Sequence, residues 1–355
     1  MDAVSLLAEV LARGGSDLHL IAGASPAIRL HGSIERMEHP VLDGPTCDRM
    51  VRELLPENHK QSLDRDWQIS VSLEVDDPRT QAPLGHFRVS VHLRGGFAEA
   101  AIRVTPRRVR TPEELGLPPI MKELALRDAG LILVTGPTGQ GKTTTFNSLI
   151  DHINQRRKLK IVTIEDPVEY RHAHRESVVV QLEVGADTHS FAEALRHALR
   201  EDPDVICVGE MRDLETISTA LTAAETGHLV LATLHTPSAV GTLSRIIDVF
   251  PAGQQEQVKV QLANVLTAVV TQRLLPRADG RGRVLATEVL ICTDAVRNQI
   301  REQKFHQVHN VMATSKAQGM QRLEDHLRLL LESGAITRAV AAGAANDVRL
   351  IQDLL

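Results

Sequence analysis

The sequence predicts an α/β protein with two domains, an α+β domain over residues 1–105 and a larger domain over 113–355. The chain has 355 residues, which is too long for one ordinary core. The first hundred residues contain short segments in which apolar and polar residues alternate. From Glu113 onward, apolar runs alternate with helical patterns, as in a parallel sheet with crossover helices. Residues 106–112 contain two prolines and three arginines and interrupt all periodicity. They are therefore predicted to be the linker.

The first domain is predicted to begin with a helix and to continue with short strands. Alternation of apolar and polar residues in the last three of these segments indicates antiparallel strands with one buried face. The expected elements are a helix over Ala3–Ala12 and strands over Asp17–Ile21, Ala27–Leu30, Ile69–Val75, Phe87–Leu93 and Glu99–Val104.

The second domain is predicted to alternate strands and helices as far as Pro251 and to be mostly helical from there to Leu355, apart from one strand over Val284–Leu290. Short runs rich in apolar residues between helical segments are typical of strands buried on both faces. The expected strands before Pro251 are Leu131–Thr135, Ile161–Glu165, Val178–Gln181, Val205–Gly209 and Leu229–Leu234, and the expected helices are Thr143–Asn154, Phe191–Arg200 and Leu214–Glu225.

Composition argues against several classes of function. The formal charge is −5, so no global cationic field is available to hold nucleic acid, and one Trp and one Tyr are too few for base stacking. The three cysteines are far apart and form no CxxC pair, which argues against a disulfide framework and a structural zinc site. A reducing cytoplasm is the simplest compartment. No stretch of eighteen uncharged apolar residues is present, so any membrane association is expected to come through a partner rather than by insertion.

A phosphate-binding loop is the strongest motif in the chain. The segment GPTGQGKT (136–143) fits the pattern GxxxxGK[ST], follows the apolar run LILVT and precedes a helical pattern. Glycines let the loop turn its backbone amides inward, and the following helix adds its positive dipole end. The lysine can reach the β and γ phosphates of ATP, and the Thr143 hydroxyl can ligate Mg²⁺. The expected nucleotide-binding residues are Gly136, Pro137, Thr138, Gly139, Gln140, Gly141, Lys142, Thr143 and Thr144.

Acidic residues follow two of the other predicted strands. Glu210 ends an apolar run, where a carboxylate could hold Mg²⁺ through water. The segment TIEDPVE (163–169) offers Glu165, Asp166 and Glu169 as candidate bases for the attacking water, and the residues alone do not decide between them. Solvation or helix capping is an alternative role for each.

Two histidines, His228 and His235, stand at the ends of the predicted strand Leu229–Leu234. A histidine at a strand end is often a structural residue. The position of His235 nevertheless permits a role in sensing the γ-phosphate.

Taken together, these segments resemble one family closely, the secretion and type IV pilus ATPases, and within it the retraction ATPases of twitching motility. The segments that match are GGSDLHL (14–20), TPEELGLP (111–118), LVTGPTGQGKTTT (133–145), TIEDPVEY (163–170), the long run 195–229, TLHTPSA (233–239) and RIIDVFP (245–251). They extend over nearly the whole chain.

The resemblance implies roles for individual residues. Glu169 matches the catalytic base of the family's acidic box, Glu210 its atypical Walker B glutamate, and His228 and His235 its paired histidines. Arg88 and Arg103 correspond in position to arginines that reach the γ-phosphate from the N-terminal domain. The sequence around Arg88 and Arg103 differs from the family's usual sequence, so Arg94 is an alternative candidate for the same role.

The resemblance also implies an architecture and partners. We expect a PAS-like N-terminal domain and a RecA-like ATPase domain with a helical C-terminal part, assembled as a homohexamer that uses ATP and Mg²⁺. Each nucleotide would sit between the two domains. The ring would act in the cytoplasm, peripheral to the inner membrane at the pilus base, on an inner-membrane platform protein, with an accessory retraction paralogue as a further candidate partner and without nucleic acid.

Alternatives of other kinds share parts of this pattern. Extension ATPases of pilus assembly and type II secretion usually carry an extra N-terminal domain and a four-cysteine zinc insertion, which this sequence lacks. A RecA-like DNA motor and a nucleotide-sensing scaffold without turnover are further alternatives. One C-terminal segment favours retraction: AVRNQIREQK (295–304) resembles the family's AIRNLIREGK, although Gln303 replaces a glycine whose backbone freedom glutamine lacks.

Overall fold

The computed structural model describes residues 2–30, 33–77, 80, 82–105 and 108–354. The chain divides into two compact units, Met1–Arg108 with Pro167–Arg171, and Val109–Asp166 with His172–Leu355. The change between units falls inside the expected linker, of which Pro106 and Arg107 lie outside the described residues. The short segment Pro167–Arg171 groups with the first unit, although its position in the sequence lies within the range expected for the second.

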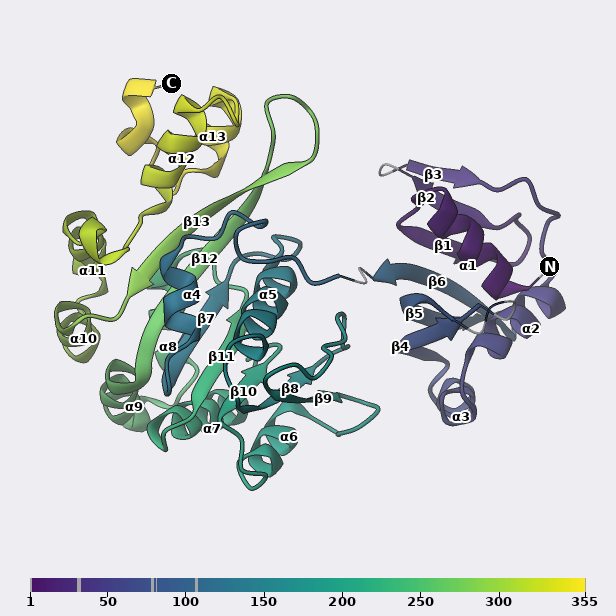
Figure 1. Ribbon diagram of the computed structural model, residues 1–355, viewed down its shortest axis with the longest axis horizontal. Helices are drawn as coiled ribbons and strands as arrows, with labels where there is room; N and C mark the ends of the chain where they lie inside the picture. Colours follow the sequence, from purple (N-terminus) through teal and green to yellow (C-terminus); the bar gives the residue numbers. More distant parts are fainter. Residues whose placement is uncertain (1, 31–32, 78–79, 81, 106–107, 355) are drawn as a thin grey trace. The chain divides into compact units, whose positions relative to one another are not determined.

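The first unit is an antiparallel sheet with helices, as the alternating pattern predicts. Within the described residues the sheet has six strands in the order β3-β2-β1-β6-β5-β4 (Figure 1). Leu6, Leu7 and Phe87 are fully buried in its core. The elements are α1 (Ala3–Ala12), β1 (Asp17–Leu20), β2 (Ala27–Leu30), β3 (Ser33–Arg36), α2 (Gly44–Leu54), α3 (Glu57–Asp66), β4 (Gln68–Asp76), β5 (Pro83–Arg94) and β6 (Phe97–Thr105).

Three elements of this unit were not predicted, and two of them, β3 and α3, show no clear apolar periodicity. All four residues of β3 are exposed, so no alternation marks the strand. Helix α3 buries only Leu63, and its other residues are polar or charged. Helix α2 did carry a local signal, because the Asp43 side chain accepts a hydrogen bond from the Thr46 amide and Pro45 lies in the first turn.

The second unit contains a mostly parallel sheet, whose described strands follow the order β13-β12-β7-β11-β10-β8-β9. Strands β7 to β12 are parallel where they pair, and β13 is antiparallel to β12. The strands are β7 (Gly130–Thr135), β8 (Lys160–Glu165), β9 (Val178–Glu183), β10 (Val205–Val208), β11 (Leu229–Leu234), β12 (Leu266–Pro276) and β13 (Arg283–Ile291).

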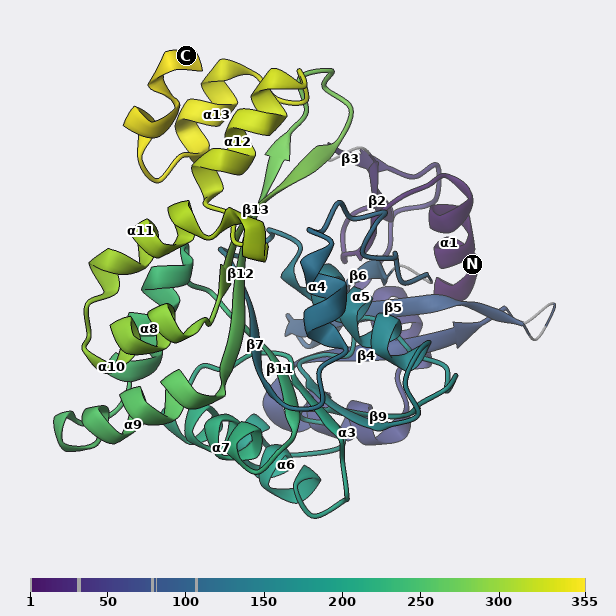
Figure 2. The same ribbon diagram turned by 60° about the vertical axis from the view of Figure 1, so that its left-hand side comes forward.

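Helices join the parallel strands and continue to the C-terminus. Helix α5 leaves the end of β7 and packs against β7 and β11, while α6 and α7 pack against each other and against β8, β10 and β11 (Figure 2). The helices are α4 (Ile120–Ala125), α5 (Lys142–Asn154), α6 (Phe191–Ala198), α7 (Leu214–Glu225), α8 (Ala239–Asp248), α9 (Ala252–Val265), α10 (Asp294–Arg301), α11 (Phe305–Thr314), α12 (Leu323–Glu332) and α13 (Arg338–Ala344), with 3₁₀ turns η1 (Lys316–Gln318) and η2 (Val348–Leu354).

The prediction of a mostly helical chain after Pro251 is wrong for Leu266–Pro276, which forms β12. This strand lies between β7 and β13, and its first seven residues are all buried, so no alternation marks it as a strand. It also follows α9 directly, without Gly or Pro at the junction, and the backbone changes from helical to extended at Leu266. A short run that is mostly apolar and buried on all sides fits a buried helix or a buried strand equally well.

The C-terminal segment that the sequence singled out forms α10 and a left-handed cap. Gln303 has φ +56°, the conformation that the replaced glycine would favour. The Lys304 amide donates to the Gln299 carbonyl over 2.9 Å and the Gln303 amide to the Ile300 carbonyl over 3.1 Å, which together form a Schellman cap. The turn that glutamine was expected to disfavour therefore forms with Gln303, at a conformational cost.

We expect Gln303→Gly to raise the free energy of unfolding by about 1 kcal/mol, because glycine adopts this backbone conformation without steric cost. Thermal and denaturant unfolding would measure the change. As a control, Glu302→Gly changes the preceding residue, whose φ is −85°, and should lower stability instead. A loss of stability in Gln303→Gly would show that its side chain contributes more than the backbone costs.

Candidate active site

The phosphate-binding loop lies between the buried strand β7 and helix α5, where the sequence places it. Gly136, Gly139 and Gly141 have φ of +143°, +77° and +82°. A Cβ at Gly136 would lie 2.5 Å from the Gln272 carbonyl oxygen, so this position excludes a side chain both by backbone conformation and by space. Helix α5 begins at Lys142, and its first amides point toward the loop. The loop therefore has the shape and the donors that a phosphate needs.

Strand β12, which was not predicted, holds this loop in place. The Gln272 side chain donates to the Gln140 carbonyl over 2.7 Å, and the Leu274 amide donates to the Gln140 side-chain oxygen over 2.6 Å. The hydroxyls of Thr135 and Thr271 are 2.8 Å apart at the base of the loop. The side chain of Gln140, expected at the nucleotide, thus faces β12 and positions the loop. Sequence reasoning missed Gln272 and Leu274 because the strand that carries them was read as helix.

A chain of polar contacts connects Lys142 with His235 and Glu210. The buried Lys142 ammonium donates to the carbonyls of Gly136 and Pro137 over 2.8 and 3.0 Å, and lies 3.2 Å from Nδ1 of His235. Nε2 of His235 lies 2.8 Å from Oε1 of Glu210. A neutral imidazole with its proton on Nε2 satisfies both contacts, because Nδ1 then accepts and Nε2 donates. Three residues from three separate segments therefore meet at the carboxyl edge of the sheet.

Electrostatics keeps Glu210 ionised. Burial raises the pKa of its carboxyl, but hydrogen bonds from Arg212 and His235 outweigh burial and lower it overall. Nε of Arg212 lies 2.5 Å from Oε1 of Glu210. Burial also lowers the pKa of Lys142, and the charge of Glu210 opposes this shift. Arg212 was not among the predicted residues, although its place two positions after Glu210 was a signal.

The donor set fits a nucleotide with Mg²⁺. Lys142 is buried beside the glycine loop, and Thr143 is the second residue of α5, directly after that lysine. Thr143 and the ionised Glu210 supply the hydroxyl and carboxylate oxygens that Mg²⁺ prefers. Thr138 has its hydroxyl 3.4 Å from Nδ1 of His235 and therefore borders the same space.

The three acids of the TIEDPVE segment lie in different environments. Glu165 is buried and accepts hydrogen bonds from the Thr163 hydroxyl over 2.7 Å and from the Gln181 amide over 3.1 Å. Asp166 is exposed. Glu169 is half-buried and belongs to the first unit, where burial raises the pKa of its carboxyl and the charges of Arg88 and Arg103 oppose the rise. Of the three, Glu169 has the environment that suits a general base.

The structure places Arg88 and Arg103 side by side. They are paired residues on the adjacent strands β5 and β6, and Arg103 also donates to Asp17 over 2.9 Å. Arg94, the alternative candidate for an arginine that reaches the γ-phosphate, instead pairs with Glu99. Its guanidinium donates hydrogen bonds of 2.6 to 3.0 Å to that carboxylate. Within the first unit, Arg88 and Arg103 are therefore the arginines that accompany Glu169.

His228 lies at the opposite edge of the sheet from the phosphate loop, which corrects its assignment to the phosphate site of its own chain. The His228 carbonyl accepts a hydrogen bond from the amide of Gly130, which is the first residue of β7. The phosphate loop begins after Thr135, the last residue of β7. Six residues of strand separate the two edges, or roughly 20 Å. Its Nδ1 lies 2.9 Å from the Ala223 carbonyl, so this histidine closes the turn after α7.

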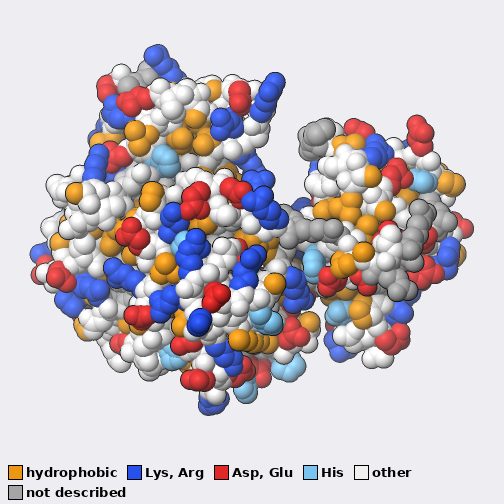
Figure 3. All heavy atoms as spheres, viewed as in Figure 1, with side chains coloured by type: hydrophobic (Ala, Val, Ile, Leu, Met, Phe, Trp, Pro, Cys, Tyr) orange, Lys and Arg blue, Asp and Glu red, His pale blue; other side chains and the backbone are white. Residues whose placement is uncertain are grey.

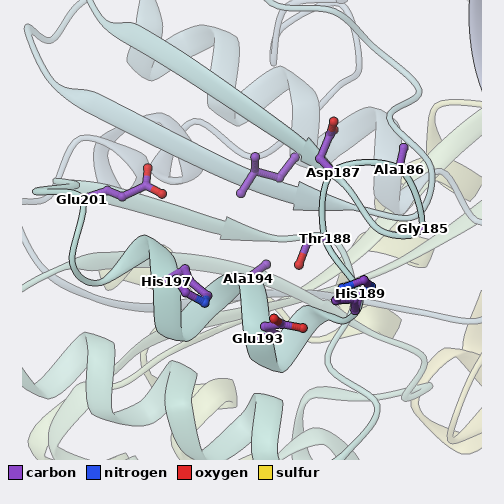
Figure 4. Close-up of a pocket in the computed structure, with 10 residues that line it drawn as sticks. Gly185, Ala186, Asp187, Thr188, His189, Glu193, Ala194, His197 and Glu201 are labelled. Atoms are coloured by element: carbon purple, nitrogen blue, oxygen red, sulfur yellow. The ribbon is translucent and has the colours of Figure 1, made fainter.

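A cavity of about 380 Å³ lies beside α6 and the loop before it (Figure 4). His189, Glu193, His197 and Glu201 line it, and none of them belongs to the phosphate site. Among the residues that the structure describes, no group of three or more His, Cys, Asp or Glu side chains is arranged to hold a metal ion. No helix in the described part of the chain is long and apolar enough to cross a membrane.

The fold and this site define a P-loop ATPase of the α/β class, and comparison with known proteins gives the same result. Residues 99–342 match the family of type II/IV secretion system proteins. The type IV pilus retraction ATPase PilT of Pseudomonas aeruginosa is 43% identical over 338 residues, which cover 95% of this chain and 96% of the relative. The type IV pilus ATPase PilU of the same organism is 38% identical over 354 residues, which cover 99% of this chain and 91% of the relative.

A solved structure agrees with these relatives. The crystal structure of the pilus retraction motor PilT with bound ADP matches with a TM-score of 0.92 and 46% identity over 99% of both chains. The chain belongs to the type II/IV secretion system protein family, and it is an ATPase.

Proposed function

We propose that this chain is the ATP-hydrolysing motor that powers type IV pilus retraction and hence twitching motility. The main support is the polar contact chain from Lys142 through His235 to Glu210. It occurs in a protein that is 43% identical to a retraction ATPase over 95% of its own length. The segment 295–304 supports the same function, because AVRNQIREQK resembles the AIRNLIREGK segment of retraction ATPases. In this segment Arg297 donates to the Asn264 carbonyl over 2.7 Å and Arg301 to the Asn264 side chain over 2.9 Å. These contacts tie α10 to the end of α9.

The two units have distinct parts in this proposal. The first is a PAS-like domain over about 1–105, and the second is a RecA-like ATPase domain with a helical C-terminal part. The antiparallel sheet with helices in the first unit and the mostly parallel sheet with a P-loop in the second support these descriptions. The cysteines Cys47, Cys207 and Cys292 are all buried and distant in sequence, which counts against the four-cysteine zinc insertion of extension ATPases.

The chemistry assigned to the site is hydrolysis of the γ-phosphate of ATP. The P-loop amides and Lys142 bind the β and γ phosphates, and Thr143 and Glu210 would hold Mg²⁺, Glu210 through water. The metal would neutralise part of the charge on the phosphate oxygens. Glu169 accepts a proton from the attacking water, and Arg88 and Arg103 stabilise the negative charge that develops. His235, between Lys142 and Glu210, responds to the presence of the γ-phosphate.

Coupling to mechanical work requires an assembly. We propose a homohexamer in which hydrolysis moves one unit relative to the other, because the catalytic groups are divided between the two units: Glu169, Arg88 and Arg103 in the first, and Lys142 and Glu210 in the second. The ring acts in the cytoplasm at the inner membrane, on a pilus platform protein and with an accessory retraction ATPase. Basic and acidic side chains are interspersed on the face in Figure 3, which gives nucleic acid no broad cationic surface there.

Deleting the gene tests the direction of the motor. We expect the deletion strain to assemble pili that extend but do not withdraw, so that electron microscopy shows excess filaments and twitching on agar is lost. Complementation with the intact gene should restore both properties. Bald cells would instead identify an extension ATPase, and unchanged piliation and motility would contradict a role in pili.

A further inference from the structure

A row of polar side chains crosses the antiparallel sheet of the first unit. The row joins residues that lie directly opposite each other in neighbouring strands, from β2 through β1, β6 and β5 to β4 (Figure 1). Because directly opposite residues point to the same face of a sheet, all members of the row share one face. In the order of the strands, the members are Arg29, Asp17, Arg103, Arg88 and Ser72.

The row lies on the face of the sheet opposite the core of the unit. Successive residues of a strand point to alternate faces, and the neighbours of the row along the strands are buried in that core, among them Val71, Leu73 and Phe87. The row contains three arginines and one aspartate. It therefore presents an excess of positive charge to any carboxylate that lies beside it.

A buried carboxylate fixes Arg103 within the row. Asp17 is only 7% exposed, and Nε of Arg103 donates to its Oδ1 over 2.9 Å. Nε of Arg29 lies 3.7 Å from the other carboxylate oxygen, on the opposite side of Asp17 in the row. This arrangement keeps Arg103 next to Arg88, its partner on β5.

Ser72, at the end of the row, holds the segment that carries Glu169. The Ser72 hydroxyl donates to the Val168 carbonyl over 2.7 Å, and Val168 directly precedes Glu169. Burial raises the pKa of Glu169, and the charges of Arg88 and Arg103 oppose the rise, so the carboxylate lies within reach of both arginines. The anchored carbonyl and the two arginines therefore belong to the same part of the first unit.

We infer that Ser72 is a positioning residue for Glu169: by holding the Val168 carbonyl, its hydroxyl fixes the catalytic base beside Arg88 and Arg103. The inference rests on the proposed function, in which Glu169 takes a proton from the attacking water. Pro167–Arg171 form a loop, and Ser72 is 96 residues away from Val168 in the sequence. The hydrogen bond thus gives this loop a fixed place that no helix or strand of its own provides, as a base requires for catalysis.

The experiment separates placement of the base from binding of the nucleotide. Phosphate release would give kcat, and calorimetric titration with ADP would give Kd. We expect Ser72→Ala to lower kcat about three- to tenfold, the effect of one hydrogen bond. The Kd should stay within about twofold, because the phosphate loop of the second unit holds the nucleotide. Ser72→Thr keeps the hydroxyl and suits a strand, so its kcat should stay within about twofold of the wild type.

Ser70→Ala is the matched control for Ser72→Ala. Ser70 is on the same face of β4, two residues earlier, and its hydroxyl lies 3.3 Å from that of Ser90. This variant loses a hydroxyl from the same strand and should hydrolyse ATP like the wild type. A loss in Ser70→Ala as large as in Ser72→Ala would assign the effect to the strand and overturn the inference.

A double variant shows whether Ser72 acts through Glu169. Added to Glu169→Gln, Ser72→Ala should cause no further loss of kcat, because the base that it positions is already gone. Wild-type kcat in Ser72→Ala, or a further three- to tenfold loss in the double variant, would overturn the inference and leave Glu169 as the base. Normal hydrolysis by Glu169→Gln alone would instead remove the assignment of the base, and the role of Ser72 with it.

Discussion

Replacing Lys142 with alanine is expected to abolish tight ATP binding, with a rise in Kd of roughly 100-fold, or about 3 kcal/mol, and to stop turnover. The lysine is the buried cation of the loop, and a hydrogen bond between charged groups is worth about 1.5–3 kcal/mol, more where the loss leaves charge uncompensated. Isothermal titration with ATP and a phosphate-release assay would measure the two effects.

The Lys142→Ala test needs a control for charge and for folding. Lys158 is exposed and lies outside the loop, so Lys158→Ala removes one positive charge without touching the site. Because the Lys142 ammonium also bonds the carbonyls of Gly136 and Pro137, circular dichroism and thermal unfolding must show that the variant stays folded. Retained tight binding of ATP in a folded Lys142→Ala variant would remove the site assignment.

Replacing Glu169 with glutamine is expected to lower kcat by about 10²–10⁴-fold while ATP affinity stays within about twofold. The change removes the proton acceptor without changing the size of the side chain. A base must be ionised to act, and the pKa of Glu169 is raised, chiefly by burial. Activity of the wild type should therefore fall as the pH drops toward this raised pKa, at a higher pH than for an ordinary glutamate. Single-turnover hydrolysis over a range of pH would measure both properties.

The neighbouring acids provide the comparison for Glu169. Asp166→Asn alters an exposed carboxylate and should leave kcat within a few-fold of the wild type. Glu165→Gln alters a buried acceptor of the Thr163 hydroxyl and the Gln181 amide, so we expect its main effect on stability. If Glu169→Gln hydrolyses ATP normally and one of the other variants does not, the base is that other acid.

Much of the site could be predicted from the sequence because its parts are local. The glycines, Lys142 and Thr143 occur within eight consecutive residues, and the preceding apolar run and following helix supply the context that makes such a loop specific. Glu210 and His235 were recognisable as polar residues directly after buried strands. The carboxyl ends of parallel strands meet at one edge of a sheet, so both residues were expected near the loop.

Predictions failed where a residue's role depends on the order of strands. His228 and His235 flank one strand and look equivalent in the sequence, but the direction of β11 puts only His235 at the loop. Gln272 and Leu274 were missed because nothing local separates α9 from β12. The sequence also did not show that the short segment around Glu169 groups with Arg88 and Arg103 in the first unit, although it lies between two strands of the second.

The sequence by itself determined the class of chemistry: a P-loop with its lysine, an acid directly after a neighbouring strand, and enough family motifs along the chain to indicate an ATPase of secretion and pilus systems. Only the tertiary structure decided which residues support that chemistry. The insertion of β12 beside β7 gives Gln140 its hydrogen-bond partners. The physical reason is that loop chemistry follows from consecutive residues, whereas pairing of β12 with β7 joins segments about 130 residues apart, for which no local pattern carries information.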